Sequence, residues 1–96
     1  MSYSKGTPKF EGSFSGSVTT STTDEVITIQ NGASVAVTAG NIAFKCITAC
    51  NIKLNDEANY HQFDAGDTFS FEDVAITKFT VQTSASQLKY YGNYYA

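Results

Sequence analysis

Apolar and polar residues alternate with a period of two along much of the chain between Glu25 and Tyr91. Ile42, Phe44 and Cys46, for example, occupy alternate positions, which places their side chains on one face of an extended strand. Gly, Asn and Asp interrupt the alternation at intervals of roughly 8 to 12 residues, as tight turns between short strands do. The pattern predicts an all-β fold, a single antiparallel β-sandwich or jelly roll of seven or eight short strands.

The turns divide this region into separate strands. Asn31-Gly32 stands between two apolar runs and is the dipeptide most favourable for a type I′ hairpin turn. The two-residue alternation changes phase between Ile76 and Phe79, which predicts a bulge or a brief helical turn near Thr77-Lys78. Further breaks are predicted at residues 39–41, 48–49, 55–57, 64–67 and 72–73. The predicted strands cover residues 26–29, 34–37, 42–46, 52–54, 60–63, 68–71, 76–81 and 87–91.

The composition changes about a quarter of the way along the chain. Residues 1–24 contain six Ser, five Thr and three Gly, with too few large apolar residues for a core of their own. Phe10, Phe14 and Val18 recur every four residues, but the glycines and hydroxyl residues between them disfavour a helix. We therefore expect an extended N-terminal arm over residues 1–24, either disordered or docked on a partner, and a β-sandwich domain over residues 25–96.

The charge pattern argues against two classes of partner. The chain has six lysines, nine acidic residues and no arginine, for a net charge of −3, so it has no basic patch for nucleic acid. Its apolar runs fall far short of the roughly 20 residues that cross a bilayer, and its first residues do not resemble a signal peptide. We expect a protein that is made in the cytoplasm and binds neither nucleic acid nor a membrane.

Residues with reactive side chains are few and form no complete motif. Cys46 and Cys50 have His61 as their one possible His partner, whereas structural zinc needs four ligands. The two cysteines would form a disulfide if residues 48–49 turned tightly, but buried free thiols are the favoured interpretation.

The remaining polar candidates have ordinary explanations. His61 has no nucleophile in a recognisable context beside it, which favours a surface position. Four acidic residues cluster around predicted turns without the spacing of a calcium loop: Asp64, Asp67, Glu72 and Asp73. We predict no catalytic residue, no cofactor and no metal site, and the chain is not expected to be an enzyme.

The C-terminal segment carries four tyrosines within six residues. Such a cluster suits a protein contact surface or a platform for sugar stacking, although alternate tyrosines can also cap a core. Because neighbouring residues of a strand face opposite sides, one of Tyr90 and Tyr91 must point outward if the other packs inward. Together with the apolar residues of the arm, the tyrosines form the predicted partner-binding set: Phe10, Phe14, Val18, Tyr90, Tyr91, Tyr94 and Tyr95.

Four short motifs in the second half of the chain carry a family resemblance. They are Asn51-Ile-Lys-Leu-Asn, Phe63-Asp-Ala-Gly-Asp-Thr-Phe-Ser-Phe, Ala75-Ile-Thr-Lys-Phe-Thr-Val and Lys89-Tyr-Tyr-Gly-Asn-Tyr. Over about residues 42–95 the chain resembles small β-sandwich virion proteins of tailed bacteriophages. The resemblance implies a capsid-decoration, head-fibre or tail-associated subunit without enzymatic activity. The expected partners are copies of the chain itself and a major capsid or other virion structural protein, and the N-terminal arm would be an anchor.

Two other classes of function stay open. A carbohydrate-binding module would use the C-terminal tyrosines as its platform, although the absence of Trp removes the most favourable stacking residue. A small inhibitor of a host protein is also compatible with an acidic chain of 96 residues.

Overall fold

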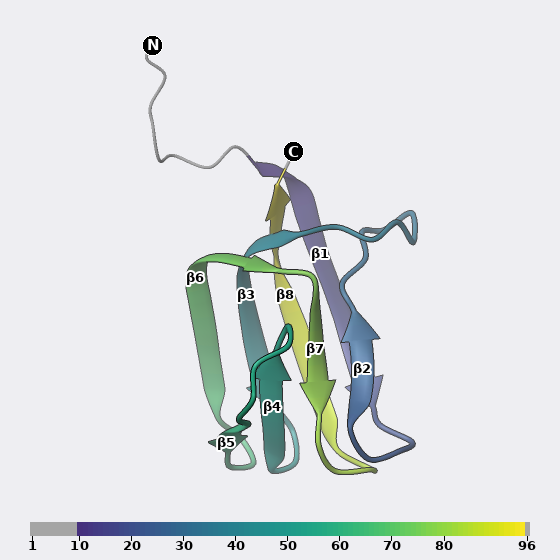
Figure 1. Cartoon of the computed structure of the whole chain (residues 1–96), viewed down its shortest axis with the longest axis vertical. Coiled ribbons are helices and arrows are strands. Elements are labelled where there is room, and N and C mark those ends of the chain that lie inside the picture. Colours follow the sequence, from purple (N-terminus) through teal and green to yellow (C-terminus); the bar gives the residue numbers. More distant parts are fainter. Residues whose placement is uncertain (1–9, 96) are drawn as a thin grey trace.

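Eight strands in two layers make up the part of the chain that the structure describes, residues 10–95 of a computed structural model (Figure 1). The strands are β1 (Phe10–Thr19), β2 (Glu25–Thr28), β3 (Ala39–Cys46), β4 (Cys50–Leu54), β5 (His61–Phe63), β6 (Thr68–Ile76), β7 (Lys78–Val81) and β8 (Gln87–Tyr95). One antiparallel sheet has the order β1-β8-β3-β6 and the other β2-β7-β4-β5. We call them the β8 sheet and the β7 sheet after a central strand of each. This is the strand order of an eight-stranded jelly roll, and the predicted fold class is confirmed.

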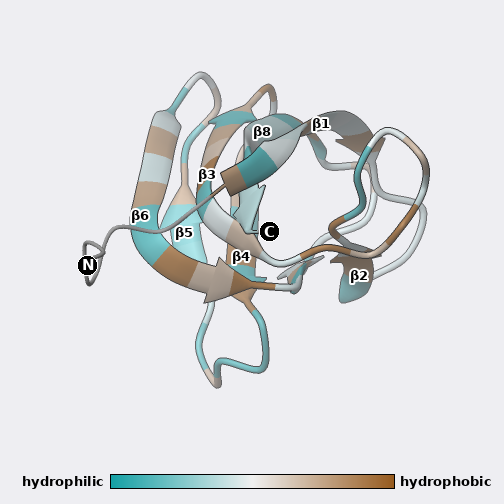
Figure 2. Ribbon diagram, turned by 90° about the horizontal axis from the view of Figure 1, so that it is seen from above, coloured by the Kyte–Doolittle hydropathy of each residue, from teal (hydrophilic) through white to brown (hydrophobic). Residues whose placement is uncertain are grey.

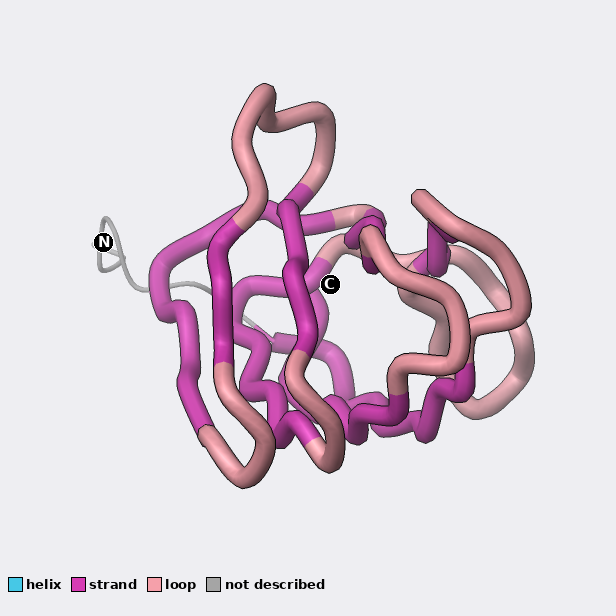
Figure 3. Tube along the Cα trace, turned by 90° about the horizontal axis from the view of Figure 1, so that it is seen from below, coloured by secondary structure: helices cyan, strands magenta, loops and turns pink. Residues whose placement is uncertain are grey.

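The hydrophobic core lies between the two sheets. Ile42, Phe44 and Cys46 of β3 are buried, and Ile52 and Leu54 of β4 are buried against them from the other layer. The alternation therefore continues in phase across residues 47–49, as the sequence predicted, while the chain passes from one sheet to the other. Seen from above, brown apolar segments mark the strands around the core (Figure 2). Figure 3 shows strands and loops throughout the described chain.

The corner between β6 and β7 is the predicted irregularity near Thr77-Lys78, which is confirmed. Only Thr77 separates the two strands, although they belong to different sheets. The side chain of Asn55 secures the corner: its Nδ2 donates to Ala75 O at 3.0 Å, and its Oδ1 accepts from Thr77 N at 3.0 Å. The turn formed by Asn55 and its neighbours thus also holds the crossing strand.

The predicted turn at residues 72–73 is wrong. Glu72 and Asp73 lie inside the nine-residue strand β6, and the chain instead forms a bulge there. Asp73 has a φ of 56°, and the pairing with β3 shifts register between Ala39 and Asn41. A bulge accommodates a turn-forming residue at positive φ without ending the strand.

The Asn31-Gly32 hairpin is only partly formed. Its strands are reduced to the Gln30–Ala36 bridge, and Ser34 N donates to Asn31 O at 2.9 Å across the turn. Ser34 has a φ of 63°, whereas Gly32 does not have a positive φ, so the turn is not type I′. The Asn31 side chain selects this geometry, because its Oδ1 accepts hydrogen bonds from Ala33 N and Val35 N.

The boundary predicted after residue 24 is wrong for the described part of the arm. Phe10–Thr19 is strand β1, paired with β8 along almost its whole length. Phe14 is only 5% exposed and belongs to the core, so the domain includes β1. Residues 1–9 of the predicted arm lie outside the described residues.

Two glycines interrupt the alternation of apolar and polar residues in β1, so the sequence pattern did not indicate this strand. Gly12 and Gly16 occupy inward positions between apolar residues, so the alternation of β1 is not visible in the residue types. The side chains of Tyr94 and Tyr90 on β8 fill the space that their missing Cβ atoms leave.

Candidate functional site

Three of the four C-terminal tyrosines serve the fold. The Tyr90 ring is half-buried and packs against the core, 5.1 Å from the Phe79 ring and 6.1 Å from the Phe14 ring between centroids, and burial raises the pKa of its hydroxyl. Tyr94 is half-buried over Gly12. Tyr95 is also half-buried: its hydroxyl donates to the backbone oxygen of Val74 at 2.8 Å. These three residues are therefore not a free contact surface.

The N-terminal residues predicted to bind a partner also pack against other parts of the fold. The Phe14 side chain is buried, and that of Val18 is half-buried against the core. Phe10 is 38% exposed, and its ring stacks on that of Tyr95 with centroids 5.6 Å apart. The structure contradicts the assignment for Phe14, and it leaves Phe10 as the most accessible residue of this group.

Tyr91 is the outward-facing tyrosine, and its side chain is 64% exposed. It stands on the outer face of the β8 sheet, opposite Ser15 of β1 and Ala43 of β3. Parity had left open which of Tyr90 and Tyr91 points outward, and the structure assigns that place to Tyr91.

Polar residues surround Tyr91 in register across all four strands. Each row runs from β1 through β8 and β3 to β6, and the three rows are Ser13-Asn93-Asn41-Glu72, Ser15-Tyr91-Ala43-Ser70 and Ser17-Lys89-Lys45-Thr68. We call this surface the Tyr91 face. It has an aromatic centre, two lysines on one side and amides with a carboxylate on the other.

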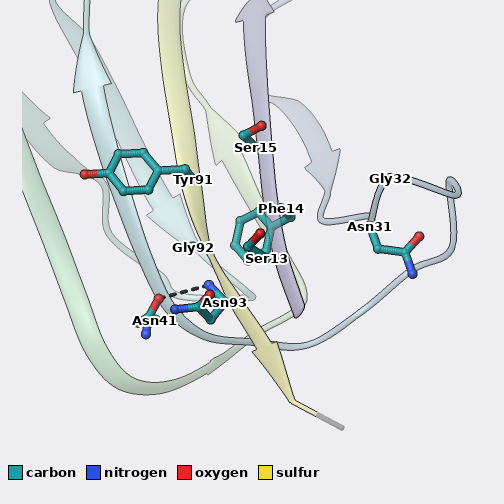
Figure 4. A pocket seen from close by; sticks show the side chains of 9 residues that line it. All are labelled: Ser13, Phe14, Ser15, Asn31, Gly32, Asn41, Tyr91, Gly92 and Asn93. Carbon is teal, nitrogen blue, oxygen red and sulfur yellow. Dashed lines mark hydrogen bonds between the residues drawn. The ribbon is translucent and has the colours of Figure 1, made fainter. Parts of the chain in front are cut away.

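Three open hollows meet at Tyr91. The largest, of about 440 Å³, extends from Tyr91 past Ser13 and Asn93 to the loop at Asn31 (Figure 4). Two others, each of about 330 Å³, lie over β3 and β6. Tyr91 is the one residue that lines all three, so the ring is a ridge between shallow hollows rather than the wall of a deep pocket.

The Asn41 amide beside the ring is held in place by the backbone of β8. Asn41 Oδ1 accepts a hydrogen bond from Asn93 N at 3.0 Å, as Figure 4 shows. This bond fixes the Asn41 amide and leaves its NH₂ group directed to other partners. Both asparagines line the hollow with the hydroxyl residues of β1. Such groups can bind ligand hydroxyls without any catalytic chemistry.

The lysines of the Tyr91 face differ from the other described lysines. Lys78 Nζ lies 2.9 Å from Asp56 Oδ1, and Lys53 Nζ lies 5.0 Å from the centre of the Tyr60 ring. Lys45 and Lys89 are exposed and directly opposite each other, and neither has an ion-pair partner within residues 10–95. Like charges that face each other across two strands destabilise the pair.

Both cysteines are buried, as predicted, and their thiols are free in the structure. Cys50 Sγ donates to Thr48 O at 3.2 Å. Burial, together with the neighbouring Cys50, raises the pKa of the Cys46 thiol to about 12. At such a pKa the thiol is protonated near neutral pH and is a poor nucleophile.

The other candidate residues are on the surface. His61 is exposed, as predicted, and its Nε2 lies 3.2 Å from Glu57 Oε1. Asp67 Oδ2 accepts from Asp64 N at 2.8 Å within a turn, which is the ordinary role expected for these acids. In residues 10–95 no three His, Cys, Asp or Glu residues gather as a metal site would require. The same residues contain no helix that is long and apolar enough to cross a membrane.

No protein-family model and no curated protein matches the chain. Among solved structures, a protein of unknown function from Vibrio parahaemolyticus is similar, with a TM-score of 0.47 and 15% identity over 81% of this chain and 70% of that one. A similarity at this level says nothing about what the chain binds.

Sequence reasoning found Tyr91 but missed most of its neighbours. Asn41 and Lys45 come from β3 and Ser70 from β6, far from the tyrosines in the sequence. Parity alone would have placed residues 41, 43 and 45 on the outer side of their strand. What the sequence did not show is that β3 lies beside β8, because that pairing depends on the topology of the whole fold.

Proposed function

We propose that this chain is a non-enzymatic structural subunit of a tailed-phage virion, and that it assembles with copies of itself and with a major capsid or other virion protein. The resemblance of residues 42–95 to small phage virion proteins supports the virion role. The observation that carries the assembly proposal is the free edge of β1, a strand of ten residues at the side of the β8 sheet.

The backbone groups on this edge can be assigned. Thr20 N donates to Ser86 O at 2.9 Å and continues the β1–β8 pairing, so the even-numbered residues direct their N–H groups toward β8. Because successive residues of an antiparallel strand alternate, Ser13, Ser15 and Ser17 direct theirs to the opposite side. Within the described chain no strand pairs with that side.

The other three edges have features that discourage pairing. The edge strands β2 and β5 have only four and three residues. The edge strand β6 carries Glu72 and Asp73 at a bulge. By contrast, Glu11 is the only charged residue of β1, and the pairing of β1 with β8 is regular from Gly12 onward. A long, regularly paired edge strand with little charge is the kind that accepts another strand.

Amide exchange combined with mass measurement tests the assembly. The oligomeric mass should rise with concentration, and the amides of Ser13, Ser15 and Ser17 should then become protected. Ser17→Pro should prevent association, because it removes an edge N–H without breaking a bond to β8, whereas Ser17→Ala should associate normally. If Ser17→Pro does not fold, amide exchange at Ser13, Ser15 and Ser17 of the unmodified protein still tests whether the β1 edge is the interface.

Two results would contradict the proposal. A chain that stays monomeric at all accessible concentrations, with rapid exchange at the three serines, would rule out self-association through β1. Mass spectrometry of purified particles of the encoding phage tests the virion role, which fails if the chain is absent from them.

A second function, carbohydrate binding, is favoured by the isolation of Tyr91 on a polar face. An exposed aromatic ring among Asn, Ser and Lys side chains offers stacking and hydrogen bonds together. Replacing Tyr91 by Ala should abolish binding to a polysaccharide while leaving the oligomeric mass unchanged. Loss of oligomers in that variant would instead show that Tyr91 belongs to a protein interface.

A further inference from the structure

We infer that the Tyr91 face binds an acidic saccharide, with a sugar ring stacked on Tyr91 and its anionic group held between Lys45 and Lys89. The inference rests on the second proposed function, carbohydrate binding, and specifies the class of ligand. It starts from the placement of charge on the molecule.

The chain is acidic overall, yet two of its lysines lie together without a counter-charge among residues 10–95. Each of the two other described lysines already has a partner, an acid for Lys78 and an aromatic ring for Lys53. Lys45 and Lys89 face each other across β3 and β8, where like charges repel at a Cα separation of about 5.5 Å. An anion placed between their ammonium groups would remove the repulsion and pair with both.

The lysine pair is within reach of a sugar on Tyr91. Lys89 and Tyr91 are two residues apart on β8, so they share a face at a distance of about 7 Å. The long side chain of Lys89 can span much of that distance. A carboxylate, sulfate or phosphate on a pyranose ring stacked on Tyr91, or on the next ring, can therefore contact the lysines while the ring stays on the tyrosine.

The other charged group on the three rows sets the orientation. Glu72 lies in the row of Asn41 and Asn93, on the far side of Tyr91 from the lysines. The face is therefore positive at one end and negative at the other. An acidic sugar should place its anion at the lysine end, with its hydroxyls toward the asparagines.

Two double variants with the same change of net charge provide the test. K45Q/K89Q removes the pair on the Tyr91 face, and K53Q/K78Q removes two lysines of the β7 sheet. The ligands are polygalacturonate and its fully methyl-esterified form, which share a backbone but differ in charge. Calorimetry at low salt should show preferential binding of polygalacturonate, weakened about five- to tenfold in K45Q/K89Q and little changed in K53Q/K78Q, as expected for two exposed charge pairs.

The outcomes separate this inference from carbohydrate binding itself. One outcome is that both polymers bind equally, with binding lost in Tyr91→Ala but kept in K45Q/K89Q. That result would support carbohydrate binding but overturn the inference that the saccharide is acidic. Binding to neither polymer would overturn both. Equal, lysine-dependent binding of duplex DNA or of phosphatidylserine vesicles would show a general anion site and overturn the saccharide assignment.

Stability provides an independent readout. Because the facing lysines repel each other, K45Q/K89Q should unfold at the same or a slightly higher denaturant concentration than the unmodified protein. A marked loss of stability would mean that the pair serves the fold, and the inference would lose its basis.

Discussion

Replacing Gly92 by Ala should severely destabilise this protein, although the change adds a single methyl group. Gly92 is buried in the centre of β8, opposite Phe14 on one side and Ile42 on the other. A Cβ atom there would overlap the carbonyl oxygen of Asn41. It would also stand 2.8 Å from Phe14 Cζ and 3.0 Å from the carbonyl carbon of Asn41.

The size of the effect follows from these distances. Carbon atoms in contact are normally about 3.5 to 4.0 Å apart, so both carbons would have to move by roughly 0.5 to 1.2 Å. A ring can turn, but the Asn41 carbonyl belongs to the backbone of β3, and the same residue is tied to β8 through its side-chain Oδ1, which accepts from Asn93 N. We expect the upper end of the overpacking range, about 3 kcal/mol. For a domain of this size, that lowers Tm by about 12 °C or more.

Urea unfolding followed by circular dichroism measures this loss, and Gly32→Ala is the matched control. A Cβ at Gly32 would have no atom within 4 Å, and Gly32 does not have a positive φ. Its replacement should change stability by less than about 1 kcal/mol, and in the stabilising direction. A Gly92→Ala variant within about 0.5 kcal/mol of the unmodified protein would show that the close approach of β3 and β8 is not tight.

Three further predictions concern other parts of the fold. Phe14→Ala should lower the free energy of unfolding by about 3 to 5 kcal/mol, because Phe14 is a core residue, whereas Phe10→Ala should lower it by less than about 1 kcal/mol. Comparable losses of stability for the two variants in urea unfolding would refute the assignment of β1 to the core. Partial burial and a 2.5 Å hydrogen bond to Asp24 raise the pKa of Tyr60 to about 12, so stability should fall as pH rises from about 10 to 12. Tyr60→Phe should make that fall smaller without removing it, because the pKa values of Cys46 and Tyr90 are also raised; urea titrations at each pH measure the difference. Cys46→Ala should cost about 1 to 2 kcal/mol, and the Cys46 thiol should react with a thiol reagent at pH 8 only after unfolding; fast labelling of the folded protein would contradict its burial.

The sequence predicted the fold class where side-chain types themselves alternate. The phase of Ile42, Phe44 and Cys46 continues through Ile52 and Leu54, and both strands are present, although β3 begins at Ala39, inside the predicted break at residues 39–41, and β4 begins at Cys50. It failed at β1, where glycines occupy inward positions, and at Asp73, where a turn-forming residue lies in a bulge. In both places the neighbouring strand determines the conformation, and strand neighbours in a jelly roll are distant in sequence.

The tyrosines show how a part of that missing information is present in the sequence. Tyr90 and Tyr94 lie directly opposite Gly16 and Gly12 of β1, and their rings cover those glycines. Tyr91 has Ser15 and Ala43 opposite it, which leave no such gap on the outer face. Glycines at i and i+4 in one segment, matched by aromatic residues at the same spacing in another, therefore indicate that the two segments pair and identify the inward side. In this chain the same match excludes Tyr90 and Tyr94 from the contact surface and leaves Tyr91, with the lysines beside it, as the residue available to a ligand.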